Sequence, residues 1–343
     1  MKRKLCFFTT YYDFARQRLL TYYEEMLPKD IEIFLFCQEK EKEKFKTKRA
    51  QKIGYSKKKI FVAHYLRNFC KKNKIHFLIN LSGYLKSALV MSYATLFSNT
   101  KNIIYTHGNP TYYNHILLFP LQFFFNRILS TSPDISKKMK KYFFFSKRKT
   151  FYLIEPIDTD SFKIINKESI KRKLKLDKKD KIILFVGRIH YSKGSDYLLK
   201  IIQQNPDKKF ILIGQLMDDN YKINELKNII YIPQANTEEL REYYNASDLY
   251  LFLSRGEGVG FTFREAMSCG TSAITFNIES VKTVENTIKV PENINEIQKA
   301  IDSFFNLSKK EKKILSNKSR KEMLEKYSLK SLKEDHINMF LNF

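Results

Sequence analysis

Short apolar runs alternate with segments of helical pattern along most of this chain, in two successive series. The first series opens with an apolar run at residues 5–10, a helical pattern at 14–26 and a second apolar run at 31–37. A strand, a helix and a second strand at this spacing form a right-handed crossover between parallel strands. Two such series predict two doubly wound α/β domains, each with its own parallel sheet. The strands expected in the second series are residues 182–186, 210–213, 229–232, 249–253 and 272–276.

Length and composition agree with this division. A chain of 343 residues is long enough for two domains with separate cores. Hydrophobic residues make up 43% and aromatic residues 15%, which is typical of a folded globular protein. We expect one Rossmann-like domain over residues 1–165 and another over residues 166–325. Residues 326–343 are expected to form a helix that packs back on the first domain.

The net charge of +26, from 62 basic and 36 acidic residues, indicates a polyanionic partner. Nucleic acid, an anionic membrane surface and phosphorylated substrates all fit such a charge. A coding sequence rich in A and T would also produce many Lys, Ile, Asn, Phe and Tyr residues and no Trp. The charge therefore suggests partners but does not choose among them.

The four cysteines show no paired spacing, so the sequence indicates neither a disulfide framework nor a zinc site. The six histidines form no metal-binding pattern on one helix face. The first ten residues are too short and too polar for a signal peptide, and no apolar run approaches the ~18 residues of a membrane-spanning helix. These observations predict a cytoplasmic protein, soluble or peripheral, with no metal cofactor.

Residues 251–270 combine the end of a predicted strand, a glycine-rich loop and the start of a helix. That arrangement directs free backbone N–H groups and the positive end of a helix dipole at an anion. Glu257 and Glu265 flank the loop, eight residues apart. Carboxylates repel phosphate, so their expected task is to accept hydrogen bonds from hydroxyls of a ribose or a sugar. Glu265 has a local alternative, a capping box that begins at Thr262.

Arg188 and Lys193 lie on the loop that follows the predicted strand at residues 182–186. An arginine can bind phosphate oxygens bidentately, and a lysine supplies a point charge. Lys193, Gly194 and Ser195 superficially resemble a Walker A loop, but the lysine precedes the glycine and the spacer between glycines is missing. We therefore exclude a P-loop kinase or ATPase.

The run from Ser254 to Gly270 resembles the E-x7-E signature of family 4 glycosyltransferases, which have the GT-B fold. The resemblance implies two Rossmann-like domains facing a central cleft, with the acceptor on the first and the nucleotide sugar on the second. In such enzymes the Arg188–Lys193 pair would hold the donor diphosphate. The carboxylate of Glu265 would bind the ribose, and Glu257 would contact the transferred sugar.

Further site residues follow from the same resemblance. The backbone amides near the helix start would approach the sugar and the phosphates; they belong to Gly258, Val259, Gly260 and Phe261. In the first domain, His107 follows a predicted strand in a Tyr-Thr-His-Gly context, and a histidine there faces the transferred sugar. On its local pattern alone His107 could equally be an ordinary strand-end residue.

The resemblance implies a retaining glycosyltransferase that uses a UDP- or GDP-sugar and no metal cofactor. The acceptor would be a glycan or a lipid-linked glycan, in the synthesis of cell-surface polysaccharide, lipopolysaccharide or glycoprotein glycans. Gly214 lacks the second glycine usual in the family, and Pro233 stands where a glycine commonly lies near the base. The identity of the base therefore stays open.

The segment from Lys137 to Lys149 mixes basic and aromatic side chains and follows a strongly apolar stretch at residues 116–129. This mixture suits an anionic bilayer surface, and it also suits single-stranded nucleic acid. A buried helix followed by a solvated lysine-rich helix would explain it as well. We favour peripheral binding to the inner face of the plasma membrane and expect no specific nucleic acid.

Two other functional classes deserve comparison. A non-catalytic GT-B-like protein could use its charge to bind a polyanion, but it would need no carboxylates beside its basic loop. An epimerase would need an acid/base pair, and a phosphorylase a lysine-bound cofactor; the sequence shows no convincing match to either.

Overall fold

The computed structural model describes residues 2–56, 59–82, 85–106, 123–142, 144–217, 223, 226–256 and 259–342. The chain divides into two compact units. The first comprises residues 1–156 and 332–343, and the second comprises residues 157–331.

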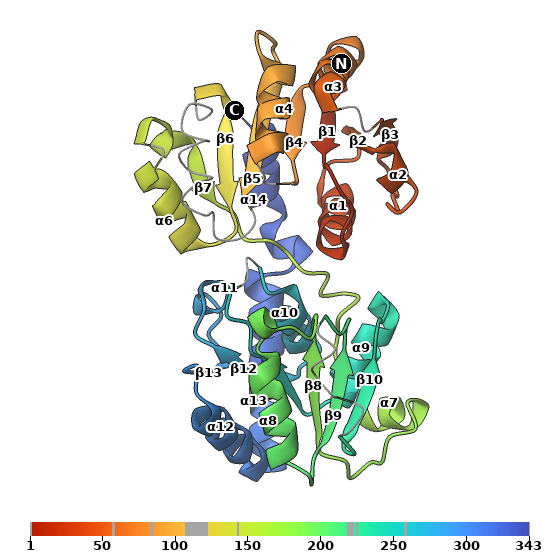
Figure 1. The fold of residues 1–343 in the computed structure, drawn as a ribbon, viewed down its shortest axis with the longest axis vertical. Coiled ribbons are helices and arrows are strands. Elements are labelled where there is room, and N and C mark those ends of the chain that lie inside the picture. Colours follow the sequence, from red (N-terminus) through yellow and green to blue (C-terminus); the bar gives the residue numbers. More distant parts are fainter. Residues whose placement is uncertain are drawn as a thin grey trace. The chain divides into compact units, whose positions relative to one another are not determined.

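The first unit is built on a seven-stranded parallel sheet in the order β3-β2-β1-β4-β5-β6-β7 (Figure 1). Its strands are β1 (Lys4–Phe8), β2 (Glu32–Gln38), β3 (Gln51–Tyr55), β4 (Phe77–Asn80), β5 (Lys101–Thr106), β6 (Arg127–Ser130) and β7 (Thr150–Tyr152). Its helices are α1 (Phe14–Met26), α2 (Glu39–Lys42), α3 (Lys59–Asn73), α4 (Leu85–Thr95), α6 (Pro133–Tyr142), the 3-10 helix η2 (Phe144–Lys149) and most of α14 (Leu329–Leu341).

Two strands of this unit differ from the sequence prediction. β3 pairs in parallel with β2, although its sequence QKIGY is largely polar and contains no continuous apolar run. β6 covers residues 127–130, where the apolar pattern suggested a buried helix. Both strands are short, and pairing with a neighbouring strand supplies backbone hydrogen bonds that a local pattern does not reveal.

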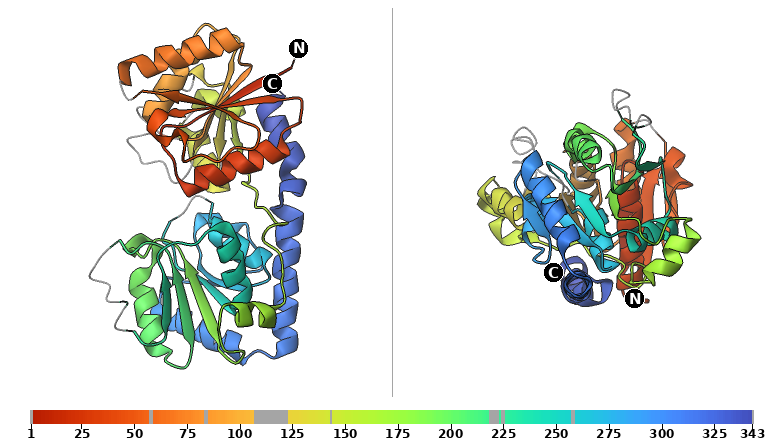
Figure 2. Two further views of the ribbon diagram at one scale, coloured as in Figure 1. Left: turned by 90° about the vertical axis from the view of Figure 1, so that its right-hand side faces the viewer. Right: turned by 90° about the horizontal axis from the view of Figure 1, so that it is seen from below.

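The last helix, α14, packs on the first unit through α1 and β6. The ring of Phe340 lies 5.0 Å from the ring of Tyr23, and Arg127 of β6 donates to the Met339 carbonyl at 2.7 Å. Arg3 donates to the Leu341 carbonyl at 3.4 Å, so residues near both chain ends lie on this unit (Figure 2).

The second unit contains a six-stranded parallel sheet in the order β10-β9-β8-β11-β12-β13 (Figure 1). Its strands are β8 (Ile182–Val186), β9 (Lys209–Ile213), β10 (Ile229–Ile232), β11 (Leu249–Phe252), β12 (Ser272–Phe276) and β13 (Ile288–Val290). Its helices are α7 (Lys167–Lys173), η3 (Tyr191–Lys193), α8 (Ser195–Gln204), α9 (Thr237–Ala246), α10 (Phe261–Ser268), α11 (Glu279–Lys282), α12 (Ile294–Asn306) and α13 (Lys309–Lys326).

The side chains of β11 alternate between the two faces of this sheet, and helices cover both faces. Leu249 and Leu251 join one buried cluster with apolar residues of α8 and α12. Tyr250 points to the opposite face, because successive side chains in a strand alternate, and its ring lies 6.0 Å from that of Tyr244 on α9. A sheet buried on both faces explains why its strands read as continuous apolar runs.

Candidate functional site

In the second unit, β9 and β10 lie on one side of β8, and β11, β12 and β13 lie on its other side. The strand order therefore reverses between β8 and β11. Ligands of open parallel sheets bind beyond the carboxyl ends of the strands at such a switch point. A pocket of about 230 Å³ lies there. Its walls come from the end of β8, the loop to η3, the end of β11 and α10; they are Phe185, Val186, Gly187, Arg188, Lys193, Phe252, Leu253, Ser254 and Thr262.

Arg188 and Lys193, predicted from the sequence as a phosphate-binding pair, both line this pocket. The loop that carries both residues ends at Gly194, whose φ is +75°. A Cβ at Gly194 would lie 2.3 Å from the carbonyl oxygen of Leu253. Glycine thus lets the loop after β8 approach the loop after β11 closely, and this brings the two cations to the end of β11.

The start of α10 supplies the third wall of the pocket through Thr262. Gly260 caps this helix in the left-handed region at φ +67°, and no side chain caps it. The first amides of a helix have no partner within the helix, so they can donate to an anion. Val259 and Phe261 flank the cap and are buried. Glu257 and Gly258 lie outside the described residues.

Glu265 takes a different position from the one its local sequence suggests. Its side chain is fully buried, and its Oε2 accepts a hydrogen bond from the Tyr244 hydroxyl at 3.0 Å. The capping box at Thr262, the local alternative for Glu265, does not form, because α10 begins at Phe261 and places Thr262 inside the first turn. Glu265 is also not among the residues that line the pocket beside Arg188 and Lys193.

Arg255 connects the glycine-rich loop to the loop after β8, a role that the sequence analysis missed. Its guanidinium donates to both carboxylate oxygens of Asp196 at 2.8 Å and to Glu292 at 2.5 Å. It also lies 3.9 Å from the ring centroid of Tyr191, and its backbone N–H donates to the Ser192 carbonyl at 3.0 Å. An arginine directly before the loop glycines was the signal available in the sequence.

The electrostatics of Asp196 reflect this contact. Burial alone would raise the pKa of its carboxyl, but hydrogen bonds from Arg255 and the charge of that arginine lower the pKa below its ordinary value. The pKa of Arg255 is correspondingly raised, chiefly by its hydrogen bonds to Asp196. The pair therefore stays ionised at neutral pH.

Two other predicted features fall wholly or partly outside the described chain. His107 lies in the segment 107–122, which the structure does not describe. Of residues 137–149, the structure describes all except residue 143, as parts of α6 and of η2. In α6, Ile135 and Met139 are buried, whereas its four lysines (Lys137, Lys138, Lys140 and Lys141) are exposed.

The described ranges contain neither a metal-binding cluster nor a membrane-spanning helix. Those residues contain no group of three or more His, Cys, Asp or Glu side chains arranged to hold a metal ion. Likewise, no described helix is both long enough and apolar enough to cross a membrane. All four cysteines are buried free thiols.

Comparison with known proteins identifies relatives of the second unit and of the whole fold. The sequence model of the family described as "Glycosyl transferases group 1" matches residues 166–338. An uncharacterized glycosyltransferase of Methanocaldococcus jannaschii is 26% identical over 188 residues, which cover 51% of this chain and 48% of that protein. This chain thus spans about half the length of the first curated relatives that it matches.

Solved structures extend the likeness to the whole chain. A glycosyltransferase from Rickettsia africae superposes with a TM-score of 0.82 at 16% identity, covering 100% of both chains. Anabaena HepE in complex with UDP and glucose superposes with a TM-score of 0.79 at 13% identity, covering 98% of both. At such identities the likeness concerns the fold, and it confirms the two-sheet architecture predicted from the sequence. The chain has the GT-B fold and belongs to the group 1 glycosyltransferase family.

Proposed function

We propose that this protein is a glycosyltransferase that moves a sugar from a nucleoside-diphosphate sugar to an acceptor hydroxyl. The observation that carries the proposal is the convergence of Arg188, Lys193 and the start of α10 on one pocket beyond β8 and β11. Two cations and a helix N-terminus together suit a diphosphate anion. Family membership supports the reaction class, and the UDP bound to HepE, a protein of the same fold, is in keeping with such a donor.

The chemistry follows from where charge develops during the reaction. As the bond from the sugar to the diphosphate breaks, negative charge grows on the departing phosphate and positive charge grows on the sugar. Arg188, Lys193 and the amides after Gly260 would stabilise the phosphate charge from positions set before the reaction begins. These groups supply that stabilisation without a metal ion, and we propose a metal-independent enzyme that retains the anomeric configuration.

The remaining roles rest on the family resemblance. Glu257 and His107 would contact the transferred sugar, and the amides of Gly258, Val259 and Phe261 would approach its phosphates. Glu265 would bind the ribose hydroxyls, which requires its carboxylate to exchange the hydrogen bond from Tyr244 for bonds from the ligand.

The acceptor is proposed to be a glycan or lipid-linked glycan, with the enzyme bound peripherally to an anionic membrane. Support comes from α6, which buries Ile135 and Met139 and presents four lysines to solvent. Near an anionic bilayer each such cation contributes about 1 kcal/mol. Sedimentation with anionic vesicles tests this part, because lack of binding at physiological salt contradicts it.

A thermal-shift panel of UDP, GDP, ADP, CMP and their common sugar conjugates tests the donor site. A ligand at a hundred times its Kd stabilises the protein by about 2.7 kcal/mol. We expect one nucleotide to raise the melting temperature of the wild type and of Lys200→Ala, a control at an exposed lysine of α8 outside the pocket. The shift should be lost in Lys193→Ala.

No shift with any nucleotide would contradict the donor site. It would instead favour a non-catalytic polyanion-binding protein, for which the net charge of +26 is the supporting observation. Binding to nucleic acid or to anionic vesicles without nucleotide binding would then identify that alternative.

A further inference from the structure

A second and larger pocket lies at the amino ends of β11 and β12 in the second unit. Its volume is about 580 Å³, within the range of small-molecule sites. Asp248, which directly precedes β11, and Ser272, the first residue of β12, both line it. The pocket beside Arg188 and Lys193, the donor pocket, is lined by Phe252 at the other end of β11. Phe252 lies four residues after Asp248, or about 13 Å along the strand at ~3.3 Å per residue. The two pockets are therefore separate.

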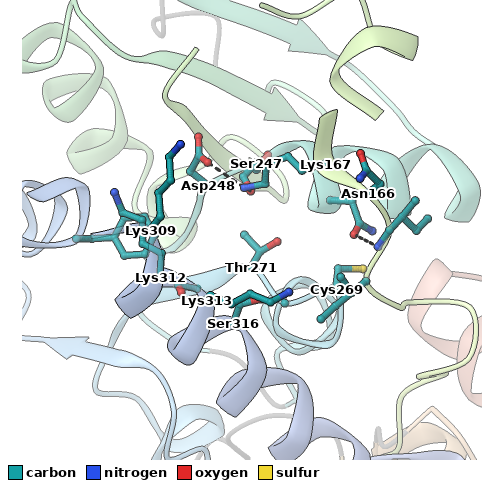
Figure 3. A pocket seen from close by; sticks show the side chains of 16 residues that line it. Asn166, Lys167, Ser247, Asp248, Cys269, Thr271, Lys309, Lys312, Lys313 and Ser316 are labelled. Carbon is teal, nitrogen blue, oxygen red and sulfur yellow. Dashed lines mark hydrogen bonds and ion pairs between the residues drawn. The ribbon is translucent and has the colours of Figure 1, made fainter. Parts of the chain in front are cut away.

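Lysines from two helices surround this second pocket. Lys167 comes from α7, and Lys309, Lys312 and Lys313 come from the first turns of α13. Residues three and four apart share one face of a helix, so α13 directs these three side chains to the same side. Figure 3 shows the four lysines around one hollow, with Thr271 and Cys269 on its wall.

Acidic side chains balance little of this charge. Asp248 is the one carboxylate among the described residues that line the pocket. It already accepts hydrogen bonds from Lys167 Nζ at 2.9 Å and from the Ile182 N–H at 2.8 Å. Asp248 therefore pairs with Lys167 and anchors the start of β8. It also attracts Lys312, and Glu168, which does not line the pocket, attracts Lys309, so the four lysines outnumber these carboxylates.

The lysines of α13 differ in how they are held. The Nζ of Lys312 donates to the Phe305 carbonyl at 2.9 Å, and it lies 5.5 Å from the ring centroid of Phe304. Burial lowers the pKa of Lys312, and the like charges of Lys181 and Lys167 act in the same direction against the attraction of Asp248. Lys309 and Lys313 are exposed and make no ion pair with any residue in the described part of the chain.

We propose that this pocket is a binding site for a phosphate-bearing anion, with Lys309 and Lys313 as its principal ligands. Lysine ammonium groups bind phosphate as point charges. Lys312, which is held by the Phe305 carbonyl, adds positive charge to the same wall. The proposal uses no residue of the donor pocket and so does not rest on the proposed function.

A thiol placed in the pocket provides a local readout. The four native cysteines are at most 4% exposed, so the thiol introduced by Ser316→Cys would be the principal target of a maleimide. Pyrophosphate at ten times its Kd leaves about a tenth of the pockets open and should slow alkylation about tenfold. Because this measures the thiol, pyrophosphate bound in the donor pocket does not contribute.

The double change Lys309→Gln with Lys313→Gln, made in the Ser316→Cys protein, should abolish this protection. A matched control, Lys310→Gln with Lys318→Gln, removes the same charge from exposed positions of α13 that do not line the pocket, and it should keep the protection. Both doubles should keep the wild-type melting temperature.

Vesicles of phosphatidylcholine with phosphatidylglycerol form the second arm of the test. Protection by pyrophosphate identifies a site for a soluble phosphate, and protection by the vesicles alone identifies a lipid headgroup as the source of the same chemistry. Protection that survives Lys309→Gln with Lys313→Gln, or its absence with both probes, overturns the proposal.

Discussion

Replacing Arg255 with alanine should both destabilise the second unit and impair the donor pocket. The side chain of Arg255 is 16% exposed and that of Asp196 is 33% exposed, so their bidentate pair is partly shielded from water. Hydrogen bonds to charged groups contribute about 1.5–3 kcal/mol, and partial exposure of Asp196 reduces this to about 1–2 kcal/mol. The more exposed Glu292 adds roughly 0.5 kcal/mol and the Tyr191 ring about 0.5 kcal/mol.

The expected loss in the free energy of unfolding is therefore about 2–3 kcal/mol. For a domain of this size each kcal/mol lowers the melting temperature by roughly 2–4 °C, so Arg255→Ala should lower it by roughly 4–12 °C. A suitable control is Lys299→Ala, which breaks the pair of an exposed lysine with the exposed Glu296 in the same unit and should change the melting temperature little.

Lowering the pH should reduce the difference in melting temperature between Arg255→Ala and the wild type. The folded state lowers the pKa of Asp196, and a carboxyl with a lowered pKa stabilises the fold above its unfolded pKa of about 3.9. That contribution is complete above about pH 5 and is lost as the pH falls through and below 3.9. Melting curves at pH 7 and in steps below pH 5 measure it.

The same change should lower kcat, because Arg255 holds the glycine-rich loop against the loop that carries Lys193. A displacement of about 1 Å can cost about a hundredfold in rate. Arg255→Lys keeps the charge but not the bidentate geometry and should recover only part of the loss. If Arg255→Ala melts like the wild type and turns over the same nucleotide sugar at the same rate, the reasoning is refuted.

Three further predictions concern the neighbouring residues. Lys193→Ala should lower kcat about 10²–10³-fold in a steady-state assay, as for removal of one group that stabilises developing charge, and near-full turnover would exclude that role. Gly194→Ala should destabilise the protein by at least about 1–3 kcal/mol in denaturant unfolding, because a Cβ at φ +75° would lie 2.3 Å from the Leu253 carbonyl; an unchanged midpoint would mean that the two loops move apart freely. Tyr244→Phe leaves the buried Glu265 short of one hydrogen bond and should cost about 1.5–3 kcal/mol in the same experiment, whereas no effect would show that water replaces the hydroxyl.

Much of the fold of the second unit could be predicted from local sequence. The apolar runs at 182–186 and 272–276 coincide with β8 and β12, because a strand buried on both faces needs a continuous apolar run. Arg188 and Lys193 could also be assigned to one loop, since only the end of β8 and the next helix were needed to place them. Family resemblance added the reaction class, which periodicity does not contain.

Tertiary structure decided the features that depend on distant partners. β3 is a strand because β2 pairs with it, despite its polar sequence. Glu265 has a capping-box pattern, yet Gly260 caps the helix and Tyr244, 21 residues away in the chain, binds the carboxylate. Arg255 finds Asp196 59 residues earlier and Glu292 37 residues later. The sequence by itself determined the strand–helix alternation, which arises from contacts within a few residues. Which polar groups meet depended on packing between elements, and no local pattern records that.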